Sequence, residues 1–539
     1  MTIRIDRRQL LHAAMYGLGA IALPGVAQVL QASGFTHGVA SGEPTADSVL
    51  LWTRFVADRD TRLAVEVARD TLFSRIVARG ECTAEPDRDH TARTVIGGLE
   101  PGRWYFYRFI ASDGSMSAVG RTRTLPQGDV KRFGLGLFSC SNVGFGWFNA
   151  YAHACERADL DLVVHVGDYL YEYAIDTYPT LKELMPGRLI QPSNEILSLA
   201  DYRLRHACYR LDPDLQLLHQ FYPMIVQWDD HEFTNDAWAG GAENHQSATE
   251  GDWAVRKAVA GRVYNEWMPV SGERWREYQI GSLATLFKAE TRITGRSELL
   301  DLNVTLKGTK NLTQSLVDFR DGPLSSATRS VLGIEQEQWL RAGLRRSTSG
   351  KTRWQILAQQ VVMGEMVVPQ QAKNWIGDDA TETTRRELNV ALAAARAGLP
   401  FNFDSWDGFP AARRRLFEDA ANANANLVVL AGDSHNAWAN NLENGKTAVG
   451  VEFATHSVTS PGFESYLPRV SSDELAGALR ATNRHLAYVD TRHRGYTSVM
   501  LTPQSATGSF HFLKTIRERS TALLETRSLS ANFDSRRFA

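Results

Sequence analysis

The chain has 539 residues, which is too long for a single hydrophobic core and favours two or three domains. Its composition, with 43% apolar and 22% charged residues, is ordinary for a globular protein. The formal net charge of −2 provides no bulk attraction to nucleic acid or to an anionic membrane. These values weigh against functions that depend on a strongly basic surface.

The N-terminal segment has the features of an export signal. Arg7 and Arg8 precede a moderately apolar stretch, 13–29, that glycine and proline interrupt. Paired arginines before such a stretch are typical of twin-arginine export, whereas a plain secretory signal and a membrane anchor are the alternatives. The stretch is short for a permanent span, and no later segment is suited to one. We expect residues 1–32 to be a signal peptide recognised by the twin-arginine export machinery, and the mature protein to be periplasmic or secreted.

Residues 33–126 are predicted to form a small all-β domain. Strand-like runs, separated by glycine and proline, lie at 48–53, 64–68 and 104–109. Residues 99–105 resemble the corner turn that leads into a tyrosine-rich strand of a fibronectin-type sandwich. Residues 125–129 contain proline and glycine and are predicted to be the linker that follows.

Residues 131–539 are predicted to form a layered α/β domain, because strand-like and helix-like patterns alternate along them. Helical patterns lie at 147–158, 336–346 and 411–425. Short apolar runs typical of buried strands end near Cys140, Asp168, Asp230, Gln359 and Asp433. One further strand is predicted at 509–515, followed by a poorly ordered end.

Four of these apolar runs lead directly into residue types that bind metals. The residues are Cys140, Asp168 with Tyr171, Asp230, and Asp433 with His435. Since α/β sheets bind ligands at the carboxyl ends of their strands, we expect these side chains to meet at one edge. A single Gly-Asp turn is usually only a turn, but four such strand ends in one chain predict a site for two cations.

The donor types separate the two predicted sites. A phenolate coordinates well only to a strongly Lewis-acidic ion, and a thiolate suits soft and borderline metals. Together these donors predict one iron-like site, suited to an ion such as Fe3+, built from Cys140, Asp168, Tyr171 and His435. The second site is rich in oxygen, which favours Ca2+ or another hard divalent ion. Its predicted ligands are Asp168, Asp230, Asn235 and Asp433. Asp236 is a further candidate, and Asp229 is either another candidate or a residue that orients His231.

Two histidines lie close to these ligands in the sequence. His231 follows Asp230 directly and is a candidate acid for the leaving group, with a role in orienting ligands as the alternative. His165 lies inside an apolar strand, where packing in the core is the expected role.

Several motifs together resemble the alkaline phosphatase D (PhoD) family across nearly the whole mature chain. They are FTHGVASGEPTADSVLLWTR at 35–54, Phe138-Ser139-Cys140, GDYLYEY at 167–173, QWDDHEFTND at 227–236, LGIEQEQWL at 332–340, SWDGFPAARRRL at 405–416 and LAGDSHNAW at 430–438. The resemblance implies an exported metallophosphoesterase with iron and calcium. It also implies a core similar in layout to purple acid phosphatases, in which an Asn-His-Glu turn stands in place of Asp230-His231-Glu232 and a histidine ligand in place of Asp433.

The predicted reaction is hydrolysis of small phosphate esters. A hydroxide generated on the cations would attack phosphorus in line while His231 protonates the departing alkoxide. Arg292 and Arg296 match a family segment near the site, where an arginine fork could hold a phosphate oxygen, with a surface ion pair as the alternative. Two other functions remain open. One is a phosphodiesterase or phospholipase D of the same family, and the other is a non-enzymatic surface protein that binds a partner through its sandwich domain.

Overall fold

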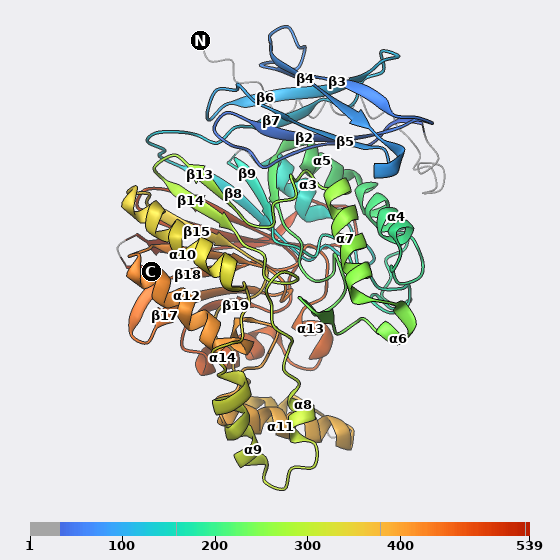
Figure 1. The fold of residues 1–539 in the computed structure, drawn as a ribbon. Coiled ribbons are helices and arrows are strands. Elements are labelled where there is room, and N and C mark those ends of the chain that lie inside the picture. The colour runs from blue at the N-terminus through green and yellow to red at the C-terminus, as the bar shows by residue number, and fades with distance from the viewer. Residues whose placement is uncertain (1–32, 158, 378, 534) are drawn as a thin grey trace.

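The computed structural model describes residues 33–157, 159–377, 379–533 and 535–539. The predicted signal peptide therefore lies outside the described residues. Two large β-sheets lie face to face in the described part, with helices on both outer faces and a further small sheet above them (Figure 1). Across these residues, no helix is both long enough and apolar enough to cross a membrane.

The larger sheet has nine strands, in the order β22-β21-β20-β8-β9-β10-β1-β2-β5. Its strands are β1 (Gly34–Gly42), β2 (Val49–Val56), β5 (Thr91–Ile96), β8 (Phe133–Phe138), β9 (Leu162–His165), β10 (Pro223–Val226), β20 (Gly495–Leu501), β21 (Ser505–Leu513) and β22 (Leu523–Asn532). Strands β8, β9 and β10 are parallel neighbours, so their carboxyl ends share one edge.

The second sheet has seven strands, in the order β13-β14-β15-β16-β18-β17-β19. Its strands are β13 (Arg276–Ile280), β14 (Ala284–Lys288), β15 (Trp354–Ala358), β16 (Leu427–Ala431), β17 (Ala437–Asn444), β18 (Thr447–Ala454) and β19 (Leu486–Asp490). Strand β16 pairs in parallel with β15 and β18, which places it at the centre of the sheet. A two-stranded ribbon, β11 (Ala237–Trp238) and β12 (Gly241–Ala242), stands apart from both sheets.

The side-chain alternation of the strands builds the core between the sheets. On β8, Leu135 and Leu137 point inward and meet residues such as Val428 and Leu430 of β16. Phe138, one position later, belongs to the cluster on the opposite face. Each such aliphatic side chain that leaves water stabilises the fold by about 1.5–3 kcal/mol. The packing between the two sheets therefore fixes where the strand ends lie.

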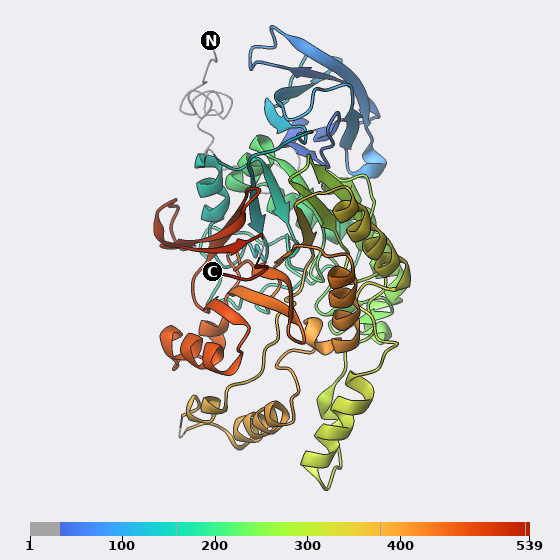
Figure 2. The same ribbon diagram turned by 90° about the vertical axis from the view of Figure 1, so that its left-hand side faces the viewer.

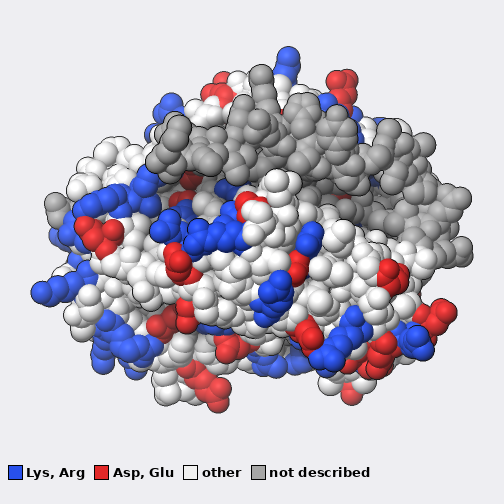
Figure 3. Space-filling model, turned by 90° about the horizontal axis from the view of Figure 1, so that it is seen from above, with Lys and Arg blue, Asp and Glu red and all other residues white. Residues whose placement is uncertain are grey.

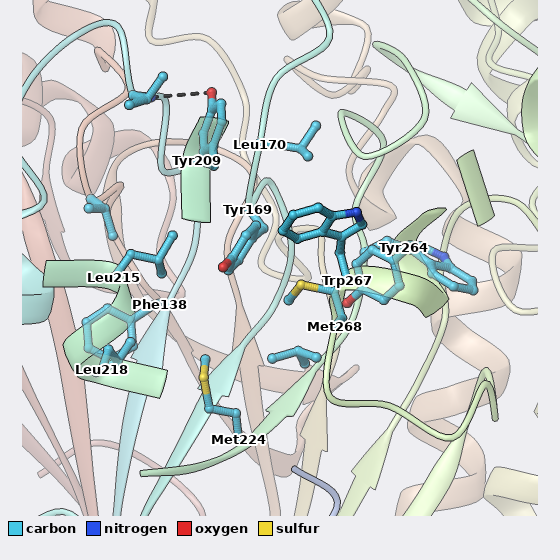
Figure 4. Packing of buried hydrophobic residues seen from close by; sticks show 14 of the residues in the cluster. Phe138, Tyr169, Leu170, Tyr209, Leu215, Leu218, Met224, Tyr264, Trp267 and Met268 are labelled. Atoms are coloured by element: carbon cyan, nitrogen blue, oxygen red, sulfur yellow. Dashed lines mark hydrogen bonds between the residues drawn. The ribbon is translucent and has the colours of Figure 1, made fainter. Parts of the chain in front are cut away.

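Helices cover the two outer faces of the stacked sheets (Figures 1 and 2). Those on the side of the nine-stranded sheet are α3 (Asn149–Glu156), α4 (Leu199–Arg210), α5 (Pro213–Phe221), α6 (Ser247–Glu250) and α7 (Trp253–Trp267). Those on the other side are α10 (Ile334–Ser349) and α12 (Pro410–Asn422). Tyr169, Trp267 and Met268 pack closely in the cluster beneath the first group (Figure 4). A capping box at Ser198 and a proline after the Asp212 cap explain why α4 and α5 begin where they do.

The remaining helices lie away from the sheet faces. Helices α8 (Leu302–Leu306), α9 (Leu312–Phe319) and α11 (Glu382–Arg396) protrude together and share a small apolar cluster (Figure 1). Helices α13 (Phe463–Tyr466) and α14 (Ser472–Thr482) lie between β18 and β19 of the seven-stranded sheet in the chain. Helix α11 begins at Glu382, inside the polar segment 375–384, whose composition is typical of a surface loop.

The N-terminal region forms a sandwich, as expected. Its outer sheet has the order β4-β3-β6-β7 and consists of β3 (Thr61–Ala68), β4 (Ile76–Ala84), β6 (Trp104–Ala111) and β7 (Gly120–Arg123). The predicted corner turn is present, since the Tyr105 hydroxyl accepts a hydrogen bond from the Glu100 amide at 2.8 Å. Its inner strands β1, β2 and β5 continue the nine-stranded sheet, because β1 pairs with β10 at Ser41 and Gly42. The predicted fold class is thereby confirmed, while the domain boundaries 33–126 and 131–539 stay predictions.

One expectation about the C-terminus is wrong. The end of the chain contains a regular strand at 523–532, because β22 pairs with β21 from Ser505 to Leu513. Most of β22 is exposed and rich in serine and threonine, so apolar periodicity does not reveal it. Ladder hydrogen bonds and hydroxyl pairs such as Thr507 with Ser530 (2.8 Å) hold it instead. Seen from above, the molecule shows Lys and Arg interspersed with Asp and Glu (Figure 3), in keeping with its small net charge.

Candidate metal centre

The predicted ligands sit on loops that leave the strands of both sheets. Cys140, Asp168 and Asp230 follow β8, β9 and β10, whereas Asp433 and His435 follow β16 of the facing sheet. The site therefore lies where the carboxyl ends of two sheets meet, rather than at the edge of one sheet. Cys140, Asp168, Asp433 and His435 all have φ between 53° and 62°. This left-handed conformation costs a non-glycine residue about 1–2 kcal/mol, and its repetition at four loop positions indicates a functional constraint.

The glycines before the two aspartates allow these loops to approach each other. A Cβ on Gly167 would lie 2.4 Å from the amide nitrogen of Asp229, and Gly167 also has φ of 106°. A Cβ on Gly432 would lie 2.5 Å from Cβ of Ser139. The two Gly-Asp pairs are therefore positions where neighbouring ligand loops touch, which explains the repeated motif.

The first ligand cluster contains the four residues predicted to hold iron. Ligand atoms of Cys140, Asp168 and His435 lie within 4.8 Å of one another. The Tyr171 hydroxyl lies 3.1 Å from Asp168 Oδ2 and 3.2 Å from His435 Nε2. Nδ1 of His435 donates to the carbonyl of Pro461 at 2.8 Å, which leaves Nε2 as the basic nitrogen that faces the cluster. Cys140 is a fully buried free thiol.

The second cluster is made of carboxylates. Oxygen atoms of Asp229, Asp230 and Asp433 lie within 4.8 Å of one another, and Asp168, Asp230 and His231 form an overlapping group. Asp168 Oδ1, Asp229 Oδ2 and Asp230 Oδ1 are buried and accept no hydrogen bond. Buried carboxylate oxygens without donors are costly unless a cation binds them. The donor set therefore fits two adjacent cations, with sulfur, nitrogen and phenol on one side and oxygen on the other.

The pKa values of three carboxyl groups in the cluster show the same need for positive charge, whereas burial at Asp230 is outweighed by Arg292 and His231, which lower its pKa to about 2. Burial raises the pKa of Asp168 well above its ordinary value, and the carboxylates of Asp230 and Asp229 add to this rise. Burial also raises the pKa of Asp433 well above its usual range and that of Asp229 to about 7. So many acids cannot all ionise together in a buried space, whereas bound cations reverse this effect.

Asn235 and Asp236 are placed differently with respect to this cluster. The Asn235 side chain donates to Glu243 at 3.1 Å, and its amide nitrogen donates to Glu172 at 2.7 Å. The amide of Asp236 donates to Asp230 Oδ2 at 2.7 Å and so orients that carboxylate. The structure thus shows Asn235 in contact with neighbouring glutamates, and its assignment as a ligand stays a prediction.

His231 lies beside the cluster with one nitrogen held in place. Its Nδ1 is 2.7 Å from Glu172, and its ring centre is 4.2 Å from that of Tyr171. Burial alone would lower the pKa of His231, but the carboxylates of Glu172, Asp230 and Asp168 outweigh it and raise the pKa well above the usual value. Because Glu172 holds Nδ1, Nε2 is the nitrogen that can face a substrate. Glu172 was not predicted to orient His231, although it lies within the GDYLYEY motif.

Glu232 joins the two central loops. Its carboxylate accepts from the amides of Asp168 (3.1 Å), Tyr169 (2.7 Å) and Asp229 (2.8 Å), so one buried side chain fixes the backbone of both loops. Sequence reasoning had no basis for this role beyond the position of Glu232 in an acidic motif.

Arg292 is buried rather than part of a surface ion pair. Its guanidinium is paired with Asp229, lies 2.6 Å from Asp404, and donates to Asp433 at 2.8 Å. Arg296 is also buried and donates to Asp404 at 2.6 Å. Arg292 thus reaches the carboxylate side of the site, whereas Arg296 contacts Asp404 beside it. The predicted contact of both arginines with a substrate phosphate stays a prediction. No sequence signal distinguished Asp404, which links them.

His165 lies in the core, as expected. It is 1% exposed, and its Nε2 is 3.0 Å from the hydroxyl of Tyr151. Burial lowers its pKa to about 3, so it is a neutral core residue.

Comparison with known proteins identifies the family of the chain. The family model described as PhoD-like phosphatase matches residues 135–510, and the model of its N-terminal domain matches residues 21–126. Alkaline phosphatase D of Bacillus subtilis (strain 168) is 32% identical over 516 residues, which cover 91% of this chain and 79% of that protein. A solved structure titled "Structure of PhoD" aligns with a TM-score of 0.76 at 30% identity, and the alignment covers 94% of this chain and 92% of the other. Given these matches, the chain belongs to the PhoD-like phosphatase family and is a phosphatase enzyme.

Proposed function

We propose that the protein is an exported, metal-dependent phosphatase that hydrolyses small phosphate esters with the help of two cations. The observation that carries this proposal is the shared geometry of the ligand clusters. Asp168 belongs both to the group with Cys140 and His435 and to the group with Asp230 and His231. Membership of two adjacent groups supports a role for this carboxylate in binding both cations, and two neighbouring cations are what phosphoryl hydrolysis uses.

The proposed metals follow from the donors. Fe3+ would be held by Cys140, Asp168, Tyr171 and His435, and Ca2+ by the carboxylates around Asp230 and Asp433. When bound, the two cations would activate a water molecule and neutralise charge on the phosphoryl oxygens.

The protein residues would supply orientation and proton transfer. Glu172 holds Nδ1 of His231, so Nε2 is the atom from which a proton would pass to the departing alkoxide. Arg292 would balance the carboxylates until a cation and a phosphate bind. In this proposal it would then hold a phosphate oxygen.

The test is a set of phosphomonoesters and phosphodiesters, assayed with and without added calcium, together with measurement of iron and calcium in the purified protein. We expect hydrolysis that depends on calcium and protein that contains iron. Full activity in protein free of both metals would contradict the proposal.

A phosphodiesterase, including a phospholipase D, is the second candidate, and an apolar groove favours it. The groove has a volume of about 390 Å3 and is lined by residues such as Trp375, Phe401 and Leu479. Met366 lines both this groove and a smaller cavity whose wall includes Asp433. An ester with an apolar alcohol would gain binding energy there. A preference for long-chain over short-chain diesters, lost in Leu479→Asp, would support this candidate, and equal rates would oppose it.

The location of the enzyme is also a proposal, since the twin-arginine segment lies outside the described residues. Metal sites of this kind fill as the chain folds, and twin-arginine export carries folded proteins. Replacement of both Arg7 and Arg8 by lysine should therefore retain active enzyme inside the cell. Unchanged secretion of the double variant would exclude this route.

A further inference from the structure

A loop outside all of the recognised motifs contacts the iron-side ligands. Residues 457–461, here called the strap, follow β18 and are buried except for Pro461. The strap amides of Val458 and Thr459 donate to the carbonyls of Ser139 (3.1 Å) and Cys140 (3.3 Å). The strap is thus attached along the loop that carries Cys140.

The strap also contacts the other two residues that belong only to the iron-side cluster. The Pro461 carbonyl accepts from Nδ1 of His435, and the amide of Ser457 donates to the His435 carbonyl at 3.2 Å. The Ser460 hydroxyl lies 2.7 Å from the Tyr171 hydroxyl and 3.1 Å from the Cys140 carbonyl. One segment therefore touches Cys140, Tyr171 and His435.

We propose that Ser460 is a positioning residue that donates a hydrogen bond to the Tyr171 oxygen when that oxygen binds the metal; the inference rests on the proposed iron site. A serine hydroxyl has one proton and two acceptor lone pairs. While Tyr171 keeps its proton and donates to Asp168, Ser460 is free to donate to the Cys140 carbonyl. A Tyr171 oxygen that binds a metal only accepts hydrogen bonds, so the Ser460 proton turns toward it across 2.7 Å.

The surroundings permit this rotation of the hydroxyl. The Cys140 carbonyl also accepts from the amides of Thr459 and Ser460, both at 3.3 Å, so it stays hydrogen-bonded when the serine proton leaves. A donor on a phenolate withdraws electron density from the oxygen. The hydrogen bond fixes the position of the phenolate oxygen. It also raises the energy of the electronic transition that moves charge from phenolate to metal.

The test is the visible spectrum of the iron-loaded enzyme, with Tyr171→Phe used to identify the tyrosinate band. We expect Ser460→Ala to move that band to longer wavelength while iron content is retained. Thr459→Ala is the matched control, because it removes a hydrogen bond of 2.7 Å to Asn142 from the same strap without touching Tyr171. A band in Ser460→Ala that coincides with that of the control would overturn the proposal.

A second measurement needs no variant and covers the case in which Ser460→Ala does not fold. The C–O stretch of the bound tyrosinate, seen by resonance Raman spectroscopy, should shift between H2O and D2O if Ser460 donates to it. An unchanged stretch would refute the role of Ser460. Wild-type protein that contains iron but lacks any tyrosinate band would instead refute the Tyr171 ligand, and with it this inference, while phosphatase activity would remain as separate evidence for the proposed function.

Discussion

The two halves of the candidate metal centre are held by different means. On the iron side, neutral groups orient the donors: the Pro461 carbonyl holds His435, and the Ser460 hydroxyl contacts Tyr171. On the carboxylate side, the guanidinium of Arg292 lies between Asp229 and Asp433. Hydrogen bonds with uncharged groups therefore orient the iron-side donors, whereas an ion pair with Arg292 neutralises part of the charge of the carboxylates.

This difference predicts unlike behaviour toward cations. A cation that enters the carboxylate side meets a guanidinium already paired with its ligands, so part of the electrostatic gain is lost on binding. Among the described residues, no arginine or lysine is hydrogen-bonded to the side chains of the four iron-side donors. We therefore expect the iron-type ion to be retained and the calcium-type ion to exchange. The predictions below test this contrast.

The largest effect is expected where the two halves share a residue. Asp168→Asn keeps the shape of the side chain but removes the charge that would bridge both cations. We expect loss of iron and calcium together, with activity reduced on the order of 10⁴-fold or more, since several kcal/mol of transition-state stabilisation would be lost. Metal content and phosphatase rate should be measured on the same sample. Retention of both metals would show that Asp168 is not the bridge.

A smaller effect is expected from His231→Ala, which should leave both metals in place. The loss for an alkyl phosphate should be about 10²–10⁴-fold, the usual contribution of general acid catalysis. The loss for an aryl phosphate with an acidic phenol should be much smaller, because that leaving group needs little protonation. His37→Asn, a change to a buried histidine that packs against Trp267, controls for general damage. An equal loss for both esters would mean that His231 is not the acid.

Removal of calcium should separate the halves without any mutation. A calcium-selective chelator should lower activity about tenfold or more, since one of the two charges on the phosphoryl oxygens is withdrawn. Iron content and the visible band should persist, and added calcium should restore the rate. Loss of the band in parallel with activity would contradict the proposed difference between the two sides.

The sequence predicted the metal-binding residues that directly follow a strand. It did not predict the residues that only hold those ligands in place. Cys140, Asp168 and Asp433 follow buried apolar runs closely. Because α/β sheets bind ligands at the carboxyl ends of their strands, this was enough to predict that the three side chains meet. Their division between two stacked sheets was not predictable, because an apolar run does not reveal which sheet it joins. Asp404 and Ser460 gave no signal at all, since their roles depend on contacts across more than 100 residues of chain. Strand β22 was missed because its stability comes from backbone pairing.

The smallest effect is expected at Asp404, which contacts Arg292 but belongs to none of the ligand clusters. Nη1 of Arg292 donates to Oδ1 of Asp404 at 2.6 Å, on the side away from the ligand clusters. Asp404→Asn would remove the charge of this partner. The guanidinium should then bind Asp229 and Asp433 more strongly and compete better with calcium, by about 1 kcal/mol or roughly fivefold in calcium affinity. Activity titrated with calcium measures this shift, and iron content should not change. Asp407→Asn is the matched control, since that buried carboxylate pairs with Arg413 instead. Calcium affinity that is unchanged, or that falls equally in the control, would show that Arg292 does not compete with the cation, and the contrast between the two halves would then have to rest on donor chemistry alone.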